Sequence, residues 1–258
     1  MSNVILIEEK EKTLNIKLNR PNVLNAIIPE MIDGIKEGIQ QAKNDSNIKA
    51  VLLSGEGRAF CSGGDIKKMG SRTAVSRFNY IGEINSLVTE MTSLEKPIIA
   101  AVHGYVTGLG FSLALASDQI IASEDTQFIL SFSKIGLISD GGALYFLARN
   151  IGSYRAKELL FNAQPLSAQT AQKWGIVNKI YSDKEFQIES ENYTKSLADG
   201  ATMAYGLIKK LTNLSLYPNM EEILELERSN TSVIGTSKDH KEGISAFAEK
   251  RRPHFRGE

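Results

Sequence analysis

The chain contains 258 residues, of which 42% are hydrophobic, and this length suffices for one large domain with a substantial core or for a domain with a helical appendage. Its 30 lysine and arginine residues balance 30 aspartate and glutamate residues, so we expect no general attraction to nucleic acid or to an acidic membrane. The single cysteine, Cys61, excludes a disulfide framework and a cysteine-based metal site.

The first half of the chain predicts strands that alternate with amphipathic helices. Two runs of alternating polarity, 4–8 and 13–18, predict a hairpin. The apolar runs 48–53 and 98–102 predict buried strands, and a helix precedes each of them. The first helix carries Met31, Ile32, Ile35 and Ile39 at helical spacing, and the second carries Val75, Phe78, Ile81, Ile84, Val88 and Met91.

Shorter elements follow, and the end of the chain is helical. We predict helices over 111–116, 143–149 and 155–161, and strands over 119–122 and 176–181. After about residue 187, only helical patterns appear, near 202–212, 220–228 and 237–251. Strands that alternate with helices indicate an α/β fold with a mainly parallel core. We therefore expect a core over residues 1–195 and a C-terminal helical region over residues 196–258.

Several common chemistries lack their sequence motifs. The sequence contains no phosphate-binding loop, no complete dinucleotide-binding glycine motif and no Gly-x-Ser-x-Gly nucleophile elbow. Its histidines do not have the spacing of metal ligands, so we expect no metal and no bound cofactor. No apolar run approaches the roughly 20 residues that cross a bilayer, and residues 1–10 contain no export signal, so we expect a cytoplasmic protein.

Three glycine-containing turns are the strongest candidates for a functional site. The turns at 58–65 and 103–110 each follow a buried strand, and the turn at 136–142 carries Asp140 just before a helix. Glycines after strands allow close approach to a ligand, and two such turns can direct two amides at one oxygen atom as an oxyanion hole. Alternatively, these are ordinary strand-to-helix turns, and Asp140 is the N-cap of the following helix.

Five segments resemble the crotonase family, also called the enoyl-CoA hydratase/isomerase family, and they occur in the family order. They are Leu18-Asn-Arg-Pro-Asn-Val-Leu-Asn-Ala26, Gly57-Arg-Ala-Phe-Cys-Ser-Gly-Gly-Asp-Ile-Lys-Lys-Met69, Lys96-Pro-Ile-Ile-Ala-Ala-Val-His-Gly104, Ser117-Asp118 and Phe247-Ala-Glu-Lys-Arg251. The resemblance implies a spiral core of ββα turns and a helical C-terminal trimerisation region, in a homotrimer or a dimer of trimers. It also implies an acyl-CoA thioester substrate, of which coenzyme A is a part, and an oxyanion hole formed by the backbone amides of Gly64 and Leu109.

The sequence departs from the hydratase pattern of this family at two positions. The resemblance places the two catalytic glutamates of hydratases at Ser112 and Phe132, and neither residue supplies the acid or base that addition of water requires. Asp140, in contrast, ends a Ser-Lys-Ile-Gly-Leu-Ile-Ser-Asp segment that resembles the epoxyphenylacetyl-CoA isomerase and enoyl-CoA isomerase branch. A dehalogenase branch with a similar aspartate also has a histidine that segment 88–96 lacks.

The resemblance further implies contacts with coenzyme A in two regions. Asp65, Ile66 and Lys67 lie in the adenine-binding turn of the family. Phe247 and Lys250 match positions that reach the adenine and the phosphates, often across a subunit boundary. Alternatively, Phe247 belongs to the core, and Lys250 is a solvated residue that the helix dipole favours at a C-terminus.

The resulting hypothesis is an acyl-CoA isomerase that forms a thioester enolate, with Asp140 as the single acid/base, and that shifts a double bond or opens an epoxide. Burial beside Leu137 and Ile138 would raise the pKa of Asp140 toward that of a base, whereas N-capping would lower it. Three alternatives remain open. They are an enoyl-CoA hydratase of the same family, a non-catalytic acyl-CoA-binding protein, and a hydrolase that uses Ser112 and His103.

Overall fold

The computed structural model describes residues 4–65, 73–215 and 219–258. Within these ranges, the main sheet has six strands in the order β1-β2-β3-β4-β6-β9, and the pairs after β1-β2 are all parallel. The strands are β1 (Ile5–Lys10), β2 (Thr13–Leu18), β3 (Ala50–Gly55), β4 (Ile98–Val102), β6 (Gln119–Ser123) and β9 (Lys179–Tyr181). The predicted hairpin and the predicted parallel α/β core are therefore confirmed.

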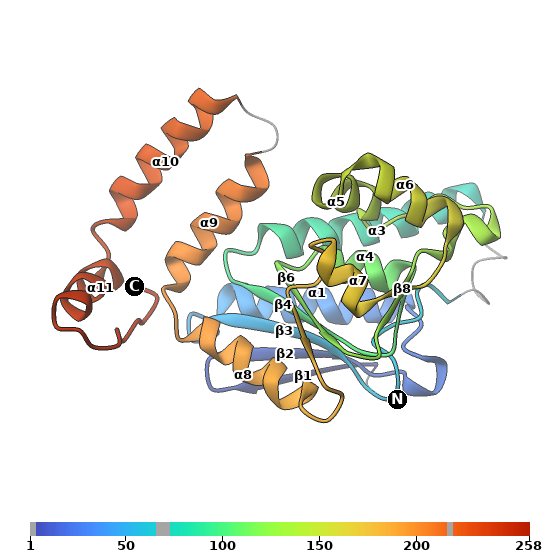
Figure 1. Cartoon of the computed structure of the whole chain (residues 1–258), viewed down its shortest axis with the longest axis horizontal. Helices are drawn as coiled ribbons and strands as arrows, with labels where there is room; N and C mark the ends of the chain where they lie inside the picture. Colours follow the sequence, from blue (N-terminus) through green and yellow to red (C-terminus); the bar gives the residue numbers. More distant parts are fainter. Residues whose placement is uncertain (1–3, 66–72, 216–218) are drawn as a thin grey trace.

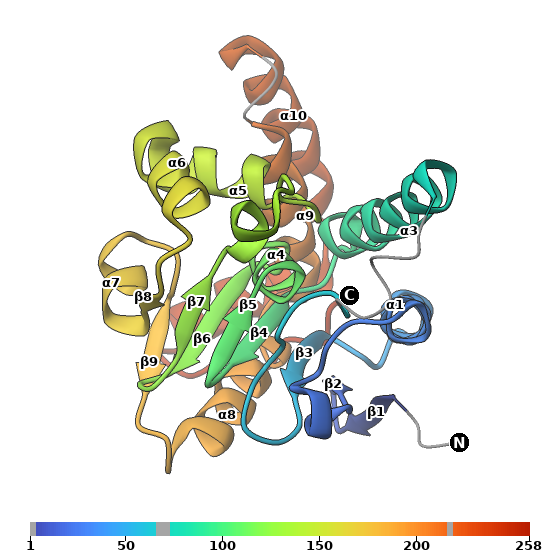
Figure 2. The ribbon, with the colours of Figure 1, turned by 90° about the vertical axis from the view of Figure 1, so that its right-hand side faces the viewer.

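Both faces of the central strands are buried, which explains their uninterrupted apolar sequences. Because side chains alternate across a strand, Leu52 and Ile99 face α8 (Phe186–Ala198), whereas Leu53 and Ala100 face the opposite, larger core. Figure 2 shows α8 on one side of the sheet and the other core helices on the opposite side. These are α1 (Pro29–Asn44), α3 (Ala74–Ser93), α4 (Leu109–Leu115), α5 (Ala143–Asn150), α6 (Gly152–Asn162) and α7 (Ala168–Lys173).

The apolar face expected along the second amphipathic helix is only half correct. In α3, Ile84 and Met91 are buried, but Val75 is 70% exposed and Phe78 is 80% exposed. Figure 2 shows the reason, because the first turns of α3 extend beyond the edge of the core. Helical spacing identifies a common face, but the extent of the neighbouring elements decides how much of that face is covered.

A second, smaller sheet was absent from the sequence-based expectation. It contains β5 (Tyr105–Thr107), β7 (Gln127–Ile129) and β8 (Leu166–Ser167) in that order. These strands have two or three residues each, which is too short for an alternating pattern to be recognised. A parallel bridge between Cys61 and Val106 of β5 extends this sheet toward the turn at 61–65.

Three C-terminal helices form an arm that extends away from the sheet (Figure 1). They are α9 (Thr202–Leu214), α10 (Met220–Ile234) and α11 (Lys238–Ala248). The predicted division at residues 195 and 196 lies inside α8, which continues to Ala198, so the first break between helices after the core comes at 199–201. Among the described residues, no helix combines the length and the apolar character needed to cross a membrane.

Candidate active site

The first glycine turn presents the amide of Gly64 away from its supporting segment. The Ile27 N–H donates to the Gly63 carbonyl at 2.7 Å, and the Asp65 N–H donates to the Ile27 carbonyl at 3.1 Å. Successive N–H groups of an extended segment point in opposite directions, so the Gly64 N–H lies on the side away from Ile27. Within the part of the chain that the structure describes, no acceptor is bonded to this N–H.

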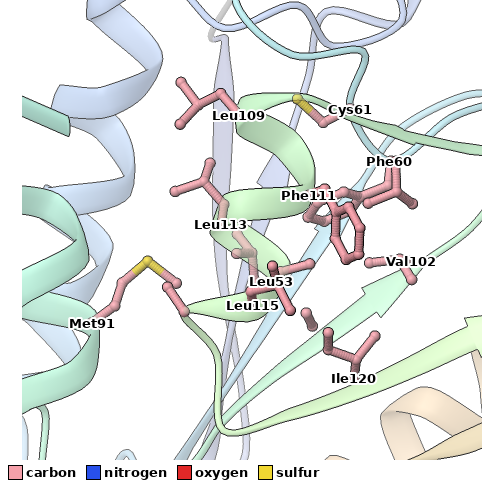
Figure 3. Packing of buried hydrophobic residues seen from close by; sticks show 14 of the residues in the cluster. Leu53, Phe60, Cys61, Met91, Val102, Leu109, Phe111, Leu113, Leu115 and Ile120 are labelled. Carbon is pink, nitrogen blue, oxygen red and sulfur yellow. The ribbon is translucent and has the colours of Figure 1, made fainter. Parts of the chain in front are cut away.

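The second turn packs directly against the first. Gly108 has a φ of 54° and precedes the first residue of α4, Leu109. A Cβ added to Gly63 would lie 3.5 Å from the Leu109 nitrogen, so the two turns are in contact. As one of the first N–H groups of a helix, the Leu109 amide has no acceptor among the described residues. Figure 3 shows Leu109 beside Cys61 at the start of α4.

The third turn places Asp140 next to α4. At Gly141, whose φ is 61°, an added Cβ would lie 2.8 Å from Leu109 Cδ1 and 2.8 Å from Ser112 Cβ. Only glycine fits this conformation and this close approach, and the backbone of Asp140 therefore lies directly on the helix that begins with Leu109. The structure thus brings together Gly64, Leu109 and Asp140, which are far apart in the sequence.

One oxygen atom of the Asp140 carboxyl group is buried and has no hydrogen-bond partner among the described residues. This atom, Oδ1, is inaccessible to solvent. Burial raises the pKa of Asp140 to about 6, and the backbone N–H of Asp140 itself opposes this shift only in part. A carboxyl group with this pKa exchanges protons near neutral pH.

Two expectations about Asp140 are wrong. The N-cap of α5 is Gly142, and no side chain bonds to the cap, so Asp140 is not the N-cap. The reason is that the positive φ values of Gly141 and Gly142 place two residues between Asp140 and the first residue of the helix. Ile138 does not bury the carboxyl group either, because it is 83% exposed. The contact of the Asp140–Gly141 segment with α4 replaces it as the packing that encloses this turn.

Comparison with known proteins identifies the group to which this arrangement belongs. Residues 8–258 match the family model for enoyl-CoA hydratase/isomerase. The chain belongs to this family. A 1,2-epoxyphenylacetyl-CoA isomerase from Escherichia coli (strain K12) is 35% identical, with 100% of both chains covered. A trans-2-decenoyl-[acyl-carrier-protein] isomerase from Streptococcus mutans is 31% identical, with 98% of each covered. A solved enoyl-CoA hydratase from Polaromonas sp. JS666 has a TM-score of 0.94 and is 32% identical, over 97% of this chain and 98% of the other.

These matches confirm the expected family and the crotonase fold, including the C-terminal helices. The two positions at which the resemblance places the catalytic glutamates of hydratases are both buried in this chain. Ser112 is fully buried, and its Oγ donates to the Asp140 carbonyl at 2.7 Å. Phe132 is also buried, and its ring is 3.7 Å from a Cβ added to Gly108. Neither residue presents an ionisable group at the site.

The contacts of Ser112 and His103 argue against the hydrolase alternative. Ser112 Oγ is occupied by a backbone carbonyl, whereas His103 Nε2 lies 2.8 Å from the carbonyl of Gly57. The His103 ring also packs against Phe186 of α8, at 5.8 Å between ring centroids. Because each side chain is bonded to a different part of the backbone, they do not form a serine–histidine pair.

The structure describes three of the five residues expected to bind coenzyme A, namely Asp65, Phe247 and Lys250. The Asp65 carboxylate lies 3.5 Å from Arg20 Nη1, so this side chain pairs with the segment before Pro21. Ile66 and Lys67 lie outside the described residues. Phe247 is 89% exposed, so its assignment to the core is wrong, and Lys250 follows the end of α11. Figure 1 shows α11 beside the start of α9, away from α4 and α5. Their contact with coenzyme A stays a prediction.

Sequence reasoning missed Asn25, which supports the first turn. Asn25 is fully buried with a φ of 54°, and its Nδ2 donates to the carbonyls of Ala59 and Phe60 at 2.9 and 3.1 Å. It therefore holds the segment that leads to Gly64. Asparagine tolerates positive φ better than most residues, and Asn25 belongs to the first family segment, so these two signals together would have pointed to it.

Proposed function

We propose that this enzyme is an acyl-CoA isomerase in which the amides of Gly64 and Leu109 form an oxyanion hole and Asp140 is the single acid/base. The observation that carries the proposal is the buried Oδ1 atom of Asp140, which has no hydrogen-bond partner among the described residues and lies beside the turn that contains Leu109. Its pKa of about 6 suits a group that must accept a carbon-bound proton and then return it. The similarity to two isomerases over nearly the whole chain supports the same activity.

In the proposed reaction, the thioester carbonyl oxygen accepts hydrogen bonds from the Gly64 and Leu109 amides. The Asp140 carboxylate removes a proton from a carbon activated by the thioester, and the electron pair of the broken C–H bond enters the enolate. The two amides stabilise the negative oxygen, and loss of one such donor typically costs about 2.7–4 kcal/mol of barrier.

In the second half of the reaction, protonated Asp140 returns a proton, which can first exchange with solvent. For an unsaturated acyl group, protonated Asp140 gives its proton to the carbon at the other end of the dienolate, so the double bond moves and no atom is gained or lost. For an epoxide beside the enolate, the enolate electron pair forms a new double bond, the ring C–O bond breaks, and the alkoxide takes the proton. One carboxyl group suffices for either reaction.

A hydratase is the second candidate, because a close structural relative carries that description. Addition of water requires a base for the water and an acid for the carbon, and Ser112 and Phe132 supply neither. A non-catalytic acyl-CoA-binding protein is the third candidate. Such a protein would bind the thioester oxygen with the Gly64 and Leu109 amides, but Asp140, despite its raised pKa, would transfer no proton.

We further propose that the substrate is bound with the help of a second copy of the chain. Asp65, Ile66 and Lys67 would contact the adenine from one subunit, and Phe247 and Lys250 would reach coenzyme A from its neighbour in a homotrimer or a dimer of trimers. The exposure of Phe247 on α11 supports this arrangement. We propose no separate cofactor and a cytoplasmic location.

A panel of thioesters tests the proposed function. We expect the purified full chain to convert trans-3-hexenoyl-CoA or 1,2-epoxyphenylacetyl-CoA to an isomer of the same mass. Chromatography separates the isomers, and mass spectrometry measures their masses. In deuterium oxide, the recovered thioester should gain deuterium. Hydration of crotonyl-CoA without isomerisation of either probe would establish the hydratase instead, and binding of all three without turnover would establish a binding protein.

A further inference from the structure

We propose that Ser112 is a positioning residue that fixes Asp140 against the oxyanion helix; this proposal rests on the function proposed above. Ser112 lies in the first turns of α4, the helix that begins with Leu109. Its Oγ donates to the Asp140 carbonyl at 2.7 Å, across 28 positions of sequence. One hydroxyl group therefore connects the backbone of the proposed acid/base with the helix that carries one of the proposed oxyanion amides.

The carboxyl group of Asp140 depends on its backbone for its position. Oδ1 has no hydrogen-bond partner among the described residues that would hold the side chain. The Asp140 carbonyl accepts two hydrogen bonds, from Ser112 Oγ at 2.7 Å and from the Ala143 N–H at 3.5 Å. The bond from Ser112 is the shorter by 0.8 Å (3.5 minus 2.7), so it is the main polar contact of this carbonyl with its surroundings.

The packing around Ser112 leaves no simple substitute for its hydroxyl group. Ser112 is fully buried, and the Asp140–Gly141 segment lies against its Cβ. The alternative acceptor for Oγ is the Gly108 carbonyl at 3.4 Å, within the helix itself. Removal of Oγ would leave the Asp140 carbonyl with only the long bond from Ala143, and the segment would be free to move relative to Leu109. A displacement of 1 Å in an active site can reduce the rate by about 100-fold.

The test compares Ser112→Ala with Ser117→Ala. Ser117 lies two residues after the end of the same helix, and its variant loses a bond to the Leu113 carbonyl at 3.3 Å. We expect Ser112→Ala to lower kcat for trans-3-hexenoyl-CoA by about tenfold or more while KM changes by less than about twofold. We expect Ser117→Ala to change neither value.

The pH profile provides a readout that a purely structural role would not move. Activity should fall as the pH decreases through the pKa of Asp140, and no charged side chain among the described residues contributes to the shift of this pKa. If Ser112→Ala loosens the segment, Asp140 becomes more solvated, its pKa falls, and the acid limb of kcat/KM moves to lower pH. A parent-like acid limb together with a parent-like kcat would overturn the proposal.

Two further variants separate this proposal from the proposed function. If Asp140→Asn isomerises at the rate of the parent, the assignment of Asp140 is wrong and the role of Ser112 falls with it. If Asp140→Asn is inactive but Ser112→Ala behaves as the parent, only the positioning role is wrong. Should Ser112→Ala not fold, Ser112→Cys keeps a group of similar size with a weaker donor. For Ser112→Cys we then expect a reduced kcat and an acid limb of kcat/KM at lower pH. Parent-like values for both would refute the positioning role of Ser112.

Discussion

Among the described residues, the buried Oδ1 atom of Asp140 has no hydrogen-bond partner, although most buried polar atoms have one. Its environment favours the protonated form, because burial penalises the charge and no cation compensates among the described residues. The same residue lies beside the turns that carry the Gly64 and Leu109 amides, and neither amide has an acceptor among the described residues. At the scale of single residues, the site therefore combines a base of raised pKa with two free donors.

The first prediction concerns the activity of Asp140→Asn. The amide keeps the size of the side chain but cannot accept a carbon-bound proton, so isomerase turnover should fall by about 100-fold or more. Binding of hexanoyl-CoA, a saturated thioester, should be retained because the Gly64 and Leu109 amides are unchanged. Turnover and calorimetric titration of the same preparations measure both quantities, and normal turnover in the variant would contradict the assignment.

The second prediction concerns the stability of the same variant. The pKa of Asp140 is about 6 in the folded protein against 3.8 ordinarily, so ionisation of this group costs stability above pH 6 and has no effect below about pH 4. Asp140→Asn removes that cost. We expect the variant to be more stable than the parent by about 1–3 kcal/mol at pH 7, with the difference decreasing as the pH falls from 6 to 4. Urea unfolding at several pH values measures this, and a variant that is less stable at pH 7 would contradict it.

At the scale of elements, two helices connect the site with the rest of the molecule. The helix α4 packs Phe111 and Leu113 into the core and presents its first amide at the site (Figure 3). The helix α9 begins the C-terminal arm and is joined to the core by Lys209. The Lys209 ammonium donates to the Met91 carbonyl at 2.8 Å and to Asp118 Oδ2 at 2.9 Å, and only 7% of its side chain is exposed.

The third prediction tests this anchor of α9. Lys209→Met removes the cation from a buried pair and leaves Asp118 with the N–H of Ile98, so stability should fall by about 3 kcal/mol. Lys210→Met is the matched control, because Lys210 pairs with Glu95 at the surface of the same helix and should change stability by less than about 1 kcal/mol. Equal melting temperatures for the two variants would show that the buried pair does not anchor the helix.

At the scale of the whole molecule, the arm of α9, α10 and α11 exposes apolar side chains that a monomer would leave in water. Leu224, Val233, Ile244 and Phe247 are all more than half exposed. Figure 1 shows that these helices lie to one side of the body of the chain, with α10 alongside α9. Extended apolar surfaces of this kind are typical of interfaces between subunits.

The fourth prediction follows from the proposed contact of Lys250 with coenzyme A. Lys250→Ala should raise KM for trans-3-hexenoyl-CoA at low salt and leave kcat nearly unchanged, because a contact remote from the reacting carbon contributes equally to the ground state and the transition state. Sedimentation of the parent should give a trimer or a hexamer. An unchanged KM at low salt would contradict the contact of Lys250 with coenzyme A. An active monomer would contradict the proposed trimer or hexamer.

The sequence alone determined the order and type of the larger elements, because apolar residues recur with the periods of strands and helices regardless of what covers them. It also located the three turns and the absence of acids at Ser112 and Phe132. Tertiary structure decided how those residues act. Asp140 has a buried carboxyl oxygen without a partner among the described residues and is not a cap, and Phe247 is exposed rather than part of the core. Burial and hydrogen bonding depend on neighbours that are distant in the sequence, as the bond between Ser112 and Asp140 illustrates, and periodicity carries no information about such neighbours.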